Sequence, residues 1–415
     1  MSESHTVIVG GGIVGICAAY FLARRGAAVT LLEQDGIDEG ASTGNAGLIS
    51  IGHAPIPRPG LTPRAIRWMF DPTSPIYIPP RLDLGLLRWF WGFRRACGRK
   101  QFKHSMDILT AHGRPAGECI RRLVDEEDLD CEYQPRGQMD VFRTEEGLEE
   151  GEREAAMMRD YGYGVEVLDG DELRRREPAF RDDVVGAVLF NERAFANPGR
   201  FVSEMADRAR RRGAVLRERH EITRLLTENG RCVGAVTRDG EEIRGDAVIL
   251  AAGSWTRRLA RQVGLNLPLQ PAKGYHVNLT RPEPCTNTAC VCAERFVAVT
   301  PMADGLRLAG TLELSGINHR IVQQRVDMLR RGARLYLRGI DETRSGEPWC
   351  GLRPCIADGL PVVGWAPGVD RLFLATGHAM MGFALGPLAG RVACECVLGD
   401  EPSVDISGLR ADRFG

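Results

Sequence analysis

Three glycines and one glutamate near the amino terminus have the spacing needed to bind the diphosphate and ribose of a nucleotide. Gly10, Gly12 and Gly15 form a G-x-G-x-x-G motif, and Glu33 follows about 20 residues after the middle glycine. In this motif the first glycine permits a tight turn, the second lets a pyrophosphate approach the backbone, and the third lets a helix pack closely on the sheet. The positive end of that helix attracts the diphosphate. The Glu33 carboxylate can accept hydrogen bonds from ribose hydroxyls and would repel a 2′-phosphate, which disfavours NADP.

The elements that must position these residues are visible in the surrounding sequence. Residues 7–33, VIVGGGIVGICAAYFLARRGAAVTLLE, predict a strand, a glycine turn, a helix and a second strand that ends at Glu33. A lone glycine motif is weak evidence in a chain with 49 glycines, and the alternative is a glycine turn that binds nothing. Here the strand, the helix and the acid all stand where the chemistry needs them. The motif therefore predicts a cofactor that contains ADP, without separating FAD from NAD.

Composition limits the other classes of function. A chain of 415 residues predicts two or three domains, and a net charge of −1 gives no general reason to expect nucleic acid as a partner. The twelve cysteines have no framework spacing, which favours a reducing, cytoplasmic location. Neither Cys285, Cys290 and Cys292 nor Cys394 and Cys396 form paired C-x-x-C motifs, so no metal site is expected. We see no charged leader and no uninterrupted apolar run long enough to span a membrane.

Later segments extend the nucleotide-binding unit. Residues 201–213 predict an amphipathic helix and residues 214–226 a strand. Residues 233–255 predict a hairpin with an Asp-Gly turn, followed by an apolar strand that closes on Ala251, Ala252 and Gly253. We expect this hairpin and strand to join the first unit in one sheet. Residues 54–195 and 266–345 differ in composition, which indicates a second domain inserted twice into the first.

Three segments together resemble one family of flavoproteins. They are the opening VIVGGGIVGICAAYFL with Glu33, the stretch GASTGNAGLIS at 40–50, and the tail that joins GLRPCIADGLPVVG to LFLATGHAMMGFALGP. With the helix RFVSEMADRARRRGA, they resemble the D-amino-acid oxidase and dehydrogenase family, most closely its bacterial D-amino-acid dehydrogenase branch. The HAMMGFALGP tail looks more like relatives that act on proline-like substrates. The resemblance extends over almost the whole chain.

The resemblance implies a fold and a cofactor. We expect an α/β protein with a Rossmann-like FAD-binding domain at residues 1–53, 196–265 and 346–415. An interleaved α+β substrate domain is expected at residues 54–195 and 266–345. The family's cofactor is FAD, and we expect it to be released on denaturation because no covalent attachment motif is recognised.

The resemblance also implies which residues hold the cofactor. The segment from Ser42 to Gly47 matches the family loop that passes the pyrophosphate and flavin, where short hydroxyls and bare amides can reach phosphate oxygens. The segments around Glu221 and Ala251 match those that wrap the ADP portion. The complete expected set is Gly10, Gly12, Ile13, Val14, Gly15, Glu33, Gln34, Ser42, Thr43, Asn45, Ala46, Gly47, Leu48, Glu221, Ile222, Ala251, Ala252, Gly253, Trp255, Arg353, Gly377, His378, Met380, Met381 and Gly382.

Arg353 is the expected substrate anchor. It stands before Pro354 in the G-L-R-P motif and matches the family position that grips an α-carboxylate. Arginine suits this task because its planar fork donates two parallel hydrogen bonds and so fixes Cα relative to the flavin. The alternative is an ordinary surface charge.

Histidines and a tyrosine are further candidates for catalytic roles. His378 precedes the final helix, whose amino terminus would stabilise the negative charge of the reduced flavin, and it could donate a hydrogen bond or simply cap the helix. Tyr275 or His276 could face the substrate pocket, as could His53; the alternative for these is a satisfied polar residue. Met381 is more typical of a pocket wall. No acid or base is required if the substrate amine arrives neutral.

The expected reaction is oxidation of a D-amino acid to its imino acid by hydride transfer from Cα to flavin N5. The substrate can be primary or cyclic, such as D-proline or hydroxy-D-proline, and the electrons pass to a respiratory or other carrier. One alternative is an oxidase that uses oxygen and acts on glycine, sarcosine or D-amino acids. Others are the flavin subunit of a heteromeric dehydrogenase complex, or a flavin-bearing subunit without turnover.

Residues 64–100 combine aromatic and basic side chains. Such a mixture suits a membrane interface, which would place the protein on the inner face of the cell membrane near a quinone; internal packing is the alternative. The apolar members are Trp68, Met69, Phe70, Tyr77, Leu86, Leu87, Trp89, Phe90, Trp91 and Phe93, and the basic ones Arg88, Arg94, Arg95, Arg99 and Lys100.

Overall fold

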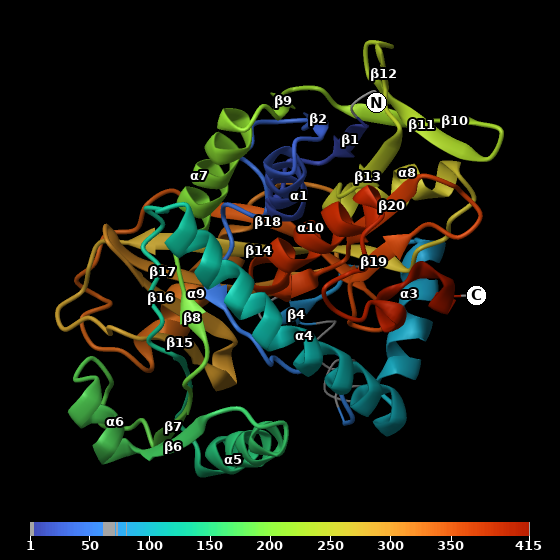
Figure 1. Ribbon diagram of the computed structural model, residues 1–415. Coiled ribbons are helices and arrows are strands. Elements are labelled where there is room, and N and C mark those ends of the chain that lie inside the picture. The colour runs from blue at the N-terminus through green and yellow to red at the C-terminus, as the bar shows by residue number, and fades with distance from the viewer. Residues whose placement is uncertain (1–3, 61–70, 72–73, 80, 415) are drawn as a thin grey trace.

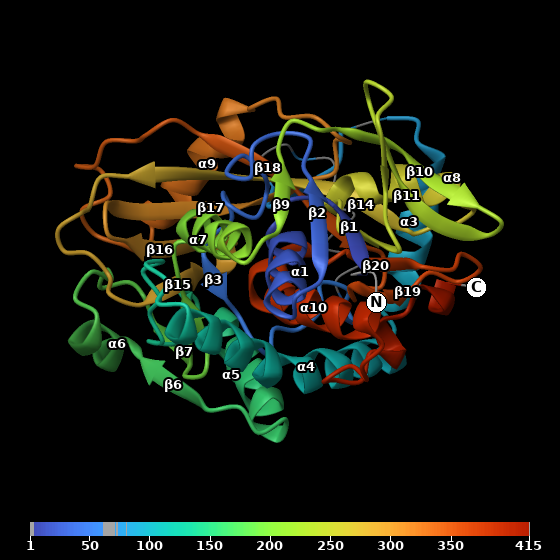
Figure 2. The ribbon, with the colours of Figure 1, turned by 45° about the horizontal axis from the view of Figure 1, so that its top comes forward.

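The computed structural model describes residues 4–60, 71, 74–79 and 81–414, and Trp68, Met69 and Phe70 lie outside these ranges. Two large sheets organise the described chain, and helices cover them (Figures 1 and 2). The expected α/β class is confirmed, and the expected first unit is present. It consists of β1 (His5–Val9), α1 (Ile13–Arg24) and β2 (Ala28–Leu32), with the two strands parallel.

The first unit belongs to a six-stranded sheet with the order β19-β20-β13-β1-β2-β9. The added strands are β9 (Val215–Arg217), β13 (Ala247–Leu250), β19 (Val362–Trp365) and β20 (Leu372–Thr376). All neighbours pair in parallel except β19, which is antiparallel to β20. The carboxyl ends of the parallel strands therefore meet at one edge, where ligands of such sheets bind.

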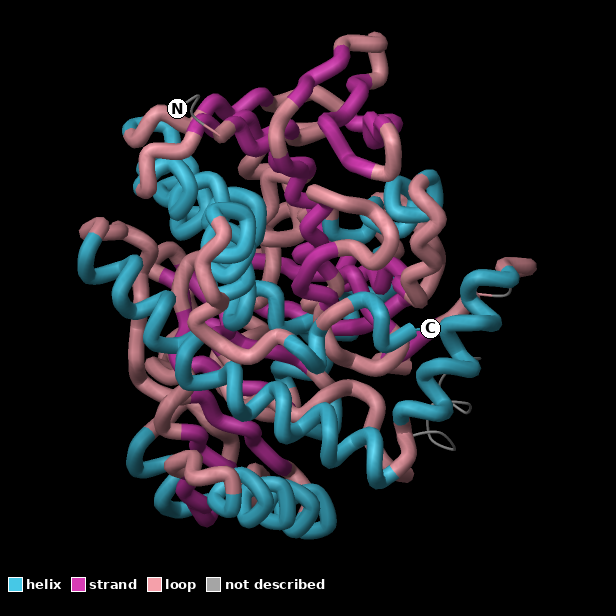
Figure 3. The backbone as a smooth tube through the Cα atoms, turned by 45° about the vertical axis from the view of Figure 1, so that its right-hand side comes forward, coloured by secondary structure: helices cyan, strands magenta, loops and turns pink. Residues whose placement is uncertain are grey.

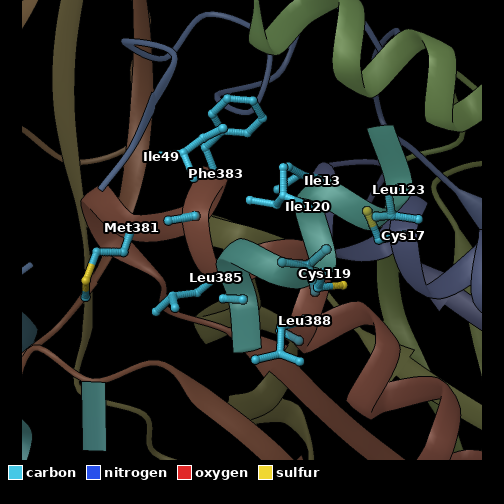
Figure 4. Close-up of a cluster of buried hydrophobic side chains, with 14 of the residues drawn as sticks. Ile13, Cys17, Ile49, Cys119, Ile120, Leu123, Met381, Phe383, Leu385 and Leu388 are labelled. Atoms are coloured by element: carbon cyan, nitrogen blue, oxygen red, sulfur yellow. The ribbon is translucent and has the colours of Figure 1, made fainter. Parts of the chain in front are cut away.

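The helices α1, α4 (Arg99–Glu126), α7 (Pro198–Arg211) and α10 (Gly382–Leu398) form the layer beside this sheet. α1 packs against α7 and α10, and α10 also packs against α4. Figure 4 shows the apolar side chains that meet there, among them Ile13 and Cys17 of α1, Ile120 of α4 and Leu388 of α10. The segment Ala379–Leu398 is long and apolar enough to cross a membrane by length and composition, although Arg391 and Glu395 interrupt it, and two thirds of its apolar stretch is buried. Its apolar character is explained by its place in the core.

The predicted hairpin forms a separate sheet. β10 (Ile222–Glu228), β11 (Arg231–Thr237) and β12 (Glu242–Arg244) make a three-stranded antiparallel sheet, while β13 joins the six-stranded one. The expectation of one common sheet is thus right for β13 and wrong for the hairpin. The single strand predicted over residues 214–226 is likewise two strands, β9 and β10. The chain must turn between them to leave one sheet for the other, and Arg219 takes a left-handed conformation there.

The second large sheet has nine strands in the order β18-β14-β17-β16-β15-β5-β7-β6, with β4 paired to β17. Their bounds are β4 (Ile76–Tyr77), β5 (Gln138–Phe142), β6 (Val165–Asp169), β7 (Gly186–Phe190), β14 (Leu269–Leu279), β15 (Ala289–Cys292), β16 (Val297–Met302), β17 (Gly305–Glu313) and β18 (Trp349–Ile356). β18 comes from the last part of the chain yet pairs with β14. The domain boundaries expected from the sequence stay a prediction.

The remaining elements cover the sheets or connect them. They are β3 (Leu48–Ile49) paired with β8 (Ala194–Phe195), the helices α3 (Leu84–Ala96), α5 (Glu145–Asp160), α6 (Gly170–Arg176), α8 (Thr256–Gln262) and α9 (Gln323–Arg334), and short 3-10 helices at Gly253–Trp255, Ala293–Arg295, Ala379–Met381, Ser407–Leu409 and Ala411–Phe414. Figure 3 shows α3 standing at the side of the molecule.

Helix α3 is apolar on two faces. Its inner face includes Leu86 and Trp89, and the Trp89 indole donates a hydrogen bond of 2.9 Å to the Cys355 carbonyl of β18. Its outer face leaves Leu87 and Trp91 63% and 64% exposed. The inner face fits the alternative of internal packing, and the membrane interface stays a prediction for the exposed outer face.

Candidate active site

A cavity of about 950 Å³ is lined by residues from both large sheets. It meets the carboxyl ends of β1, β2, β13 and β20, and it continues along β17 and β18 of the nine-stranded sheet. Its volume is near the upper end of the range for ligand cavities, about 300–1,000 Å³. The cavity is therefore large enough for a cofactor together with a small substrate.

The glycine motif packs closely against neighbouring backbone at the amino terminus of α1. Gly10 has φ +111°, a conformation that favours glycine, and a Cβ there would lie 2.5 Å from the Ala251 carbonyl oxygen. A Cβ on Gly15 would lie 1.9 Å from the Gly10 carbonyl oxygen, so the third glycine allows the helix to begin directly against the turn. Gly12 lines the cavity, and a Cβ on it would fill space beside the Ser42 hydroxyl.

The acid at the end of β2 closes this turn. One Glu33 carboxylate oxygen accepts a hydrogen bond of 2.6 Å from the Gly11 amide, and the other accepts one of 3.1 Å from the Asp35 amide. Burial raises the pKa of Glu33, against the opposing effect of these amides. A carboxylate has about four acceptor positions, so ribose hydroxyls can still bind it.

The loop at residues 42–47 is held by side chains of the nine-stranded sheet. The Ser42 hydroxyl accepts a hydrogen bond of 3.0 Å from the Ile13 amide in the first turn of α1. The carbonyl oxygens of the loop accept hydrogen bonds from three strands: Gly44 from His276 at 2.7 Å, Asn45 from Arg307 at 2.9 Å and Ala46 from Thr300 at 2.7 Å. This loop is therefore fixed at the junction of the two sheets.

Most of the expected cofactor residues line this cavity, and four do not. Those that line it are Gly10, Gly12, Ile13, Val14, Glu33, Gln34, Ser42, Asn45, Ala46, Leu48, Ile222, Ala251, Ala252, Gly253, Trp255, Arg353, Gly377, His378, Met380, Met381 and Gly382. Gly15 packs against the Gly10 carbonyl, the Thr43 hydroxyl donates to the carbonyls of residues 38 and 40, and the Gly47 amide donates to the Asn45 side chain. Glu221 lies outside the lining but forms an ion pair of 3.0 Å with Arg258, which does line it.

Arg353 reaches the cavity from β18 across a glycine. A Cβ on Gly274 of the neighbouring strand β14 would lie 1.8 Å from Arg353 Nη1, so the guanidinium occupies the space that a side chain would fill. Arg353 Nη1 donates a hydrogen bond of 2.9 Å to the Thr311 carbonyl of β17. Burial lowers the pKa of Arg353, and no carboxylate among the described residues contributes an opposing shift. The remaining N–H groups of the fork are thus available to an anion.

His378 stands where β20 gives way to the final helix. Its backbone forms a bridge with Cys355 of β18, and the residue lines the cavity and also borders a second, apolar cavity of about 20 Å³. Burial lowers its pKa to about 4, so the imidazole is neutral at physiological pH. Its buried Nε2 has no hydrogen-bond partner among the described residues. Met381 is buried in the helical core as well as lining the cavity, in keeping with a wall residue (Figure 4).

Tyr275 and His276 do not line the cavity. The Tyr275 hydroxyl donates a hydrogen bond of 2.8 Å to Glu313 inside the nine-stranded sheet. The His276 ring stacks on the Trp349 ring with centroids 4.9 Å apart, and it forms a hydrogen bond with the Gly44 carbonyl in the loop at residues 42–47. Burial lowers the pKa of His276 to about 4. These contacts favour the alternative interpretation, in which both are satisfied polar residues.

His53 lines the cavity within a cluster of charged residues that the sequence did not reveal. Its ring bonds the Ala54 carbonyl at 2.6 Å, and burial together with the charge of Arg193 lowers its pKa. Asp140 of β5 also lines the cavity, and burial raises its pKa to about 6. Glu154 of α5 acts electrostatically on both groups. No spacing in the sequence connects these residues, because they come from a loop, a strand and a helix.

Thr311 and Gly274 were also missed as site residues. An isolated glycine inside a strand pattern indicates a bulge or a close approach of another chain segment. Gly274 in PAKGYHVNL and Gly310 in LRLAGTLEL carried that signal. The structure shows what the signal meant: the strands are irregular between Lys273 and Tyr275, next to Arg353.

A family model described as FAD dependent oxidoreductase, of the DAO type, matches residues 5–396 of the chain. The protein belongs to this family.

Relatives of the FAD-dependent oxidoreductase match over the full length. A D-amino acid dehydrogenase of Methylobacterium nodulans is 32% identical, with 98% of this chain and 99% of that protein covered. A second, from Allorhizobium ampelinum, is 30% identical with 98% of each covered. Among solved structures, glycine oxidase from Geobacillus kaustophilus has a TM-score of 0.80 at 24% identity and 99% coverage of both chains. L-Proline dehydrogenase from P. horikoshii has a TM-score of 0.76 at 18% identity, with 99% of this chain and 98% of that one covered.

The cavity residues of the oxidoreductase fit FAD. The bare backbone at Gly10 and Gly12 leaves a cradle at the first turn of α1, where amides other than that of Ile13 suit a diphosphate. Glu33 is placed for the ribose, and the loop at residues 42–47 can lie along the flavin. When bound, FAD supplies the hydride acceptor of the oxidation. Arg353 and His378 line the same cavity, to which they bring a guanidinium and a neutral imidazole.

Proposed function

We propose that this FAD-dependent oxidoreductase dehydrogenates a D-amino acid, primary or cyclic, and passes the electrons to a carrier other than oxygen. The observation that carries the proposal is the environment of Arg353. The side chain is held over Gly274 and tethered to the Thr311 carbonyl, and it faces the cofactor cavity. Arg353 is half-buried, and a partly desolvated cation without a carboxylate partner is unfavourable unless a ligand anion neutralises it; an amino acid carries a suitable carboxylate.

The names of the relatives support the choice of substrate class. The two bacterial proteins at 30–32% identity are D-amino acid dehydrogenases, and the solved structures include proteins that act on glycine and on L-proline. Each of these names specifies an amino acid or an imino acid as the substrate. We therefore retain both primary and cyclic D-amino acids, including D-proline and hydroxy-D-proline, as candidates.

The test is anaerobic bleaching of the flavin in the purified holoenzyme. D- and L-isomers of the common amino acids, of proline and of hydroxyproline are added without oxygen, and air is then admitted. We expect bleaching by D-isomers and slow recovery in air. Fast recovery would favour the oxidase alternative, while no bleaching by any amino acid would contradict the substrate class.

The variant Arg353→Leu gives the matched structural test. It should retain FAD and lose most of its reduction rate at limiting substrate, because the anchor for the carboxylate is gone. Arg334→Leu is the control, since Arg334 lies exposed on α9 outside the cavity lining. Equal bleaching of the Arg353→Leu variant and the wild type would remove the anchor role.

We also propose that the outer face of α3 contacts an anionic membrane surface, where a quinone could accept the electrons. Arg88, Arg94 and Arg95 are exposed beside Leu87 and Trp91, and the described part of α3 contains no acid. Apolar side chains flanked by arginines suit the interface of an anionic bilayer.

Flotation with phosphatidylglycerol vesicles at low salt tests this surface. Binding by the wild type and its loss in Trp91→Ser would support it. Trp365→Ser is the matched control, because Trp365 is 41% exposed on β19. Failure of the wild type to float would refute the membrane contact and leave the D-amino acid proposal intact.

A further inference from the structure

Strand β17 is interrupted at Thr311. Gly310 pairs with Tyr275 of β14 and Glu313 pairs with Lys273, so Thr311 and Leu312 together face Gly274 alone. On the other side β17 pairs with β16 as far as Gly310, and with β4 from Leu312 onward. Two residues opposite one are a β-bulge, a feature that re-aims groups beside active sites.

Two features of Thr311 at this bulge are unfavourable: its backbone conformation and its unpaired hydroxyl. Its φ of +61° lies in the left-handed region, which a β-branched residue rarely occupies. Its hydroxyl is buried and has no hydrogen-bond partner among the residues that the structure describes. Such features persist where the surrounding structure fixes them, and they gather at ligand-binding sites.

The same residue is linked to the carboxylate anchor. Its carbonyl oxygen accepts the 2.9 Å hydrogen bond from Arg353 Nη1, and Gly274, opposite the bulge, leaves room for the guanidinium. Thr311, Gly310 and Leu312 all line the cavity that Arg353 lines. The bulge thus turns the Thr311 carbonyl toward Nη1 of Arg353, while Nη2 makes no hydrogen bond among the described residues.

We propose that Thr311 is a positioning residue for Arg353, and that its hydroxyl donates a hydrogen bond to the same substrate carboxylate. This inference rests on the proposed function. The carbonyl fixes Nη1, so the fork has one orientation when the substrate arrives. The orphaned hydroxyl then gains the partner that it lacks, which makes the carboxylate recognised by two side chains rather than one.

The test uses three variants of the holoenzyme. Thr311→Val removes the hydroxyl and keeps the shape, Thr311→Ser keeps the hydroxyl, and Thr311→Gly removes the hydroxyl and relieves the left-handed strain. Benzoate affinity is measured from the perturbation of the flavin spectrum, with benzamide, which lacks the carboxylate, as the control ligand. KM and kcat are measured with the best D-amino acid from the bleaching experiment.

We expect Thr311→Val to weaken benzoate binding and raise KM by about 10- to 100-fold, the effect of losing a hydrogen bond to a charged group. Its kcat should change much less, and Thr311→Ser should stay within about threefold of the wild type. Thr311→Gly should bind benzoate at least as weakly as Thr311→Val, while its Tm is not lowered. Benzamide binding should be the same throughout.

Equal benzoate affinity in Thr311→Val and the wild type would overturn the inference. If Thr311→Val gives no holoenzyme, the comparison of Thr311→Ser with Thr311→Gly decides in its place. If D-amino acids bleach the wild type but the Thr311 variants have the same benzoate affinity and KM as the wild type, this inference alone is refuted. A wild type that binds benzoate through Thr311 but is bleached by no amino acid refutes the proposed function alone, and a wild type that does neither refutes both.

Discussion

Gly274→Ala is expected to lower kcat/KM about 100-fold without unfolding the enzyme. A Cβ at residue 274 would lie 1.8 Å from Nη1, 2.4 Å from Cζ and 2.5 Å from Nη2 of Arg353. The guanidinium must therefore withdraw by roughly 1.6 Å to reach an ordinary contact of 3.4 Å. Because the obstructing atoms end a flexible side chain, the fold can accommodate the methyl group. However, the Arg353 guanidinium can no longer lie beside residue 274 of β14.

The size of the effect follows from this displacement. A misplacement of about 1 Å at a substrate-positioning group can cost about 100-fold in rate, or about 2.7 kcal/mol. The 2.9 Å bond from Arg353 to the Thr311 carbonyl must also lengthen or break. We expect kcat/KM for the best D-amino acid to fall about 100-fold. The FAD content should stay unchanged, since Gly274 does not line the cavity.

The assay is anaerobic stopped-flow reduction of the flavin over a range of substrate concentrations, with Tm and FAD content measured on the same samples. Gly346→Ala is the matched control, because its Cβ would lie 3.4 Å from the nearest atom, the Asn278 carbonyl oxygen. In an Arg353→Leu background, Gly274→Ala should have no further effect, since it acts through the guanidinium. A Gly274→Ala variant with kcat/KM within threefold of the wild type would refute the placement of the anchor.

Three further outcomes are expected. Glu33→Ala should raise the Kd for FAD by about tenfold or more, because it removes the ribose acceptor and the partner of the Gly11 amide; an unchanged FAD titration of the apoprotein would contradict this. Burial raises the pKa of Asp140 to about 6, so the wild type loses stability as pH rises from about 4 to about 6. Asp140→Asn should match the wild type below pH 4 and exceed it by about 2–3 kcal/mol above pH 6 in denaturant unfolding, and equal stability at pH 8 would argue against a buried carboxylate. With the His378 pKa lowered to about 4, the pH profile of kcat/KM between 6 and 9 should be the same in His378→Asn as in the wild type, and a lost ionisation near pH 7 would show that the imidazole titrates there.

The parts of the fold that the sequence predicted are those fixed by neighbours in the chain. The unit β1-α1-β2 is encoded within residues 5–33, where the turn, the helix start and the terminal acid follow one another. The hairpin was assigned to the wrong sheet because local alternation does not show whether a strand pairs with its neighbours in the chain or with distant strands. β13 pairs with the distant β1, whereas β10, β11 and β12 form a sheet of their own.

The site was predictable only in part, for a related reason. β14 is buried on both faces, so the alternation along it could not show that Tyr275 points to Glu313 while Gly274 faces Arg353. The left-handed conformation of Thr311 has no signature in a threonine. Arg353 was found through a family motif, but its surroundings come from β14 and β17, which contribute residues about 80 and about 40 positions earlier, respectively.

The link between the two sheets explains why the anchor and the cofactor site can be rigid relative to each other. β18 carries Arg353 and ends at Ile356, and β19 of the six-stranded sheet begins only six residues later at Val362. Asp358 in this link forms an ion pair of 2.8 Å with Arg413, whose guanidinium also donates to the carbonyls of residues 360 and 361. The backbone bridge from Cys355 to His378 joins β18 to the start of the final helix. A short, hydrogen-bonded connection leaves little freedom for hinge motion, so the distance from the carboxylate anchor to the flavin is set by the fold rather than by a closing segment.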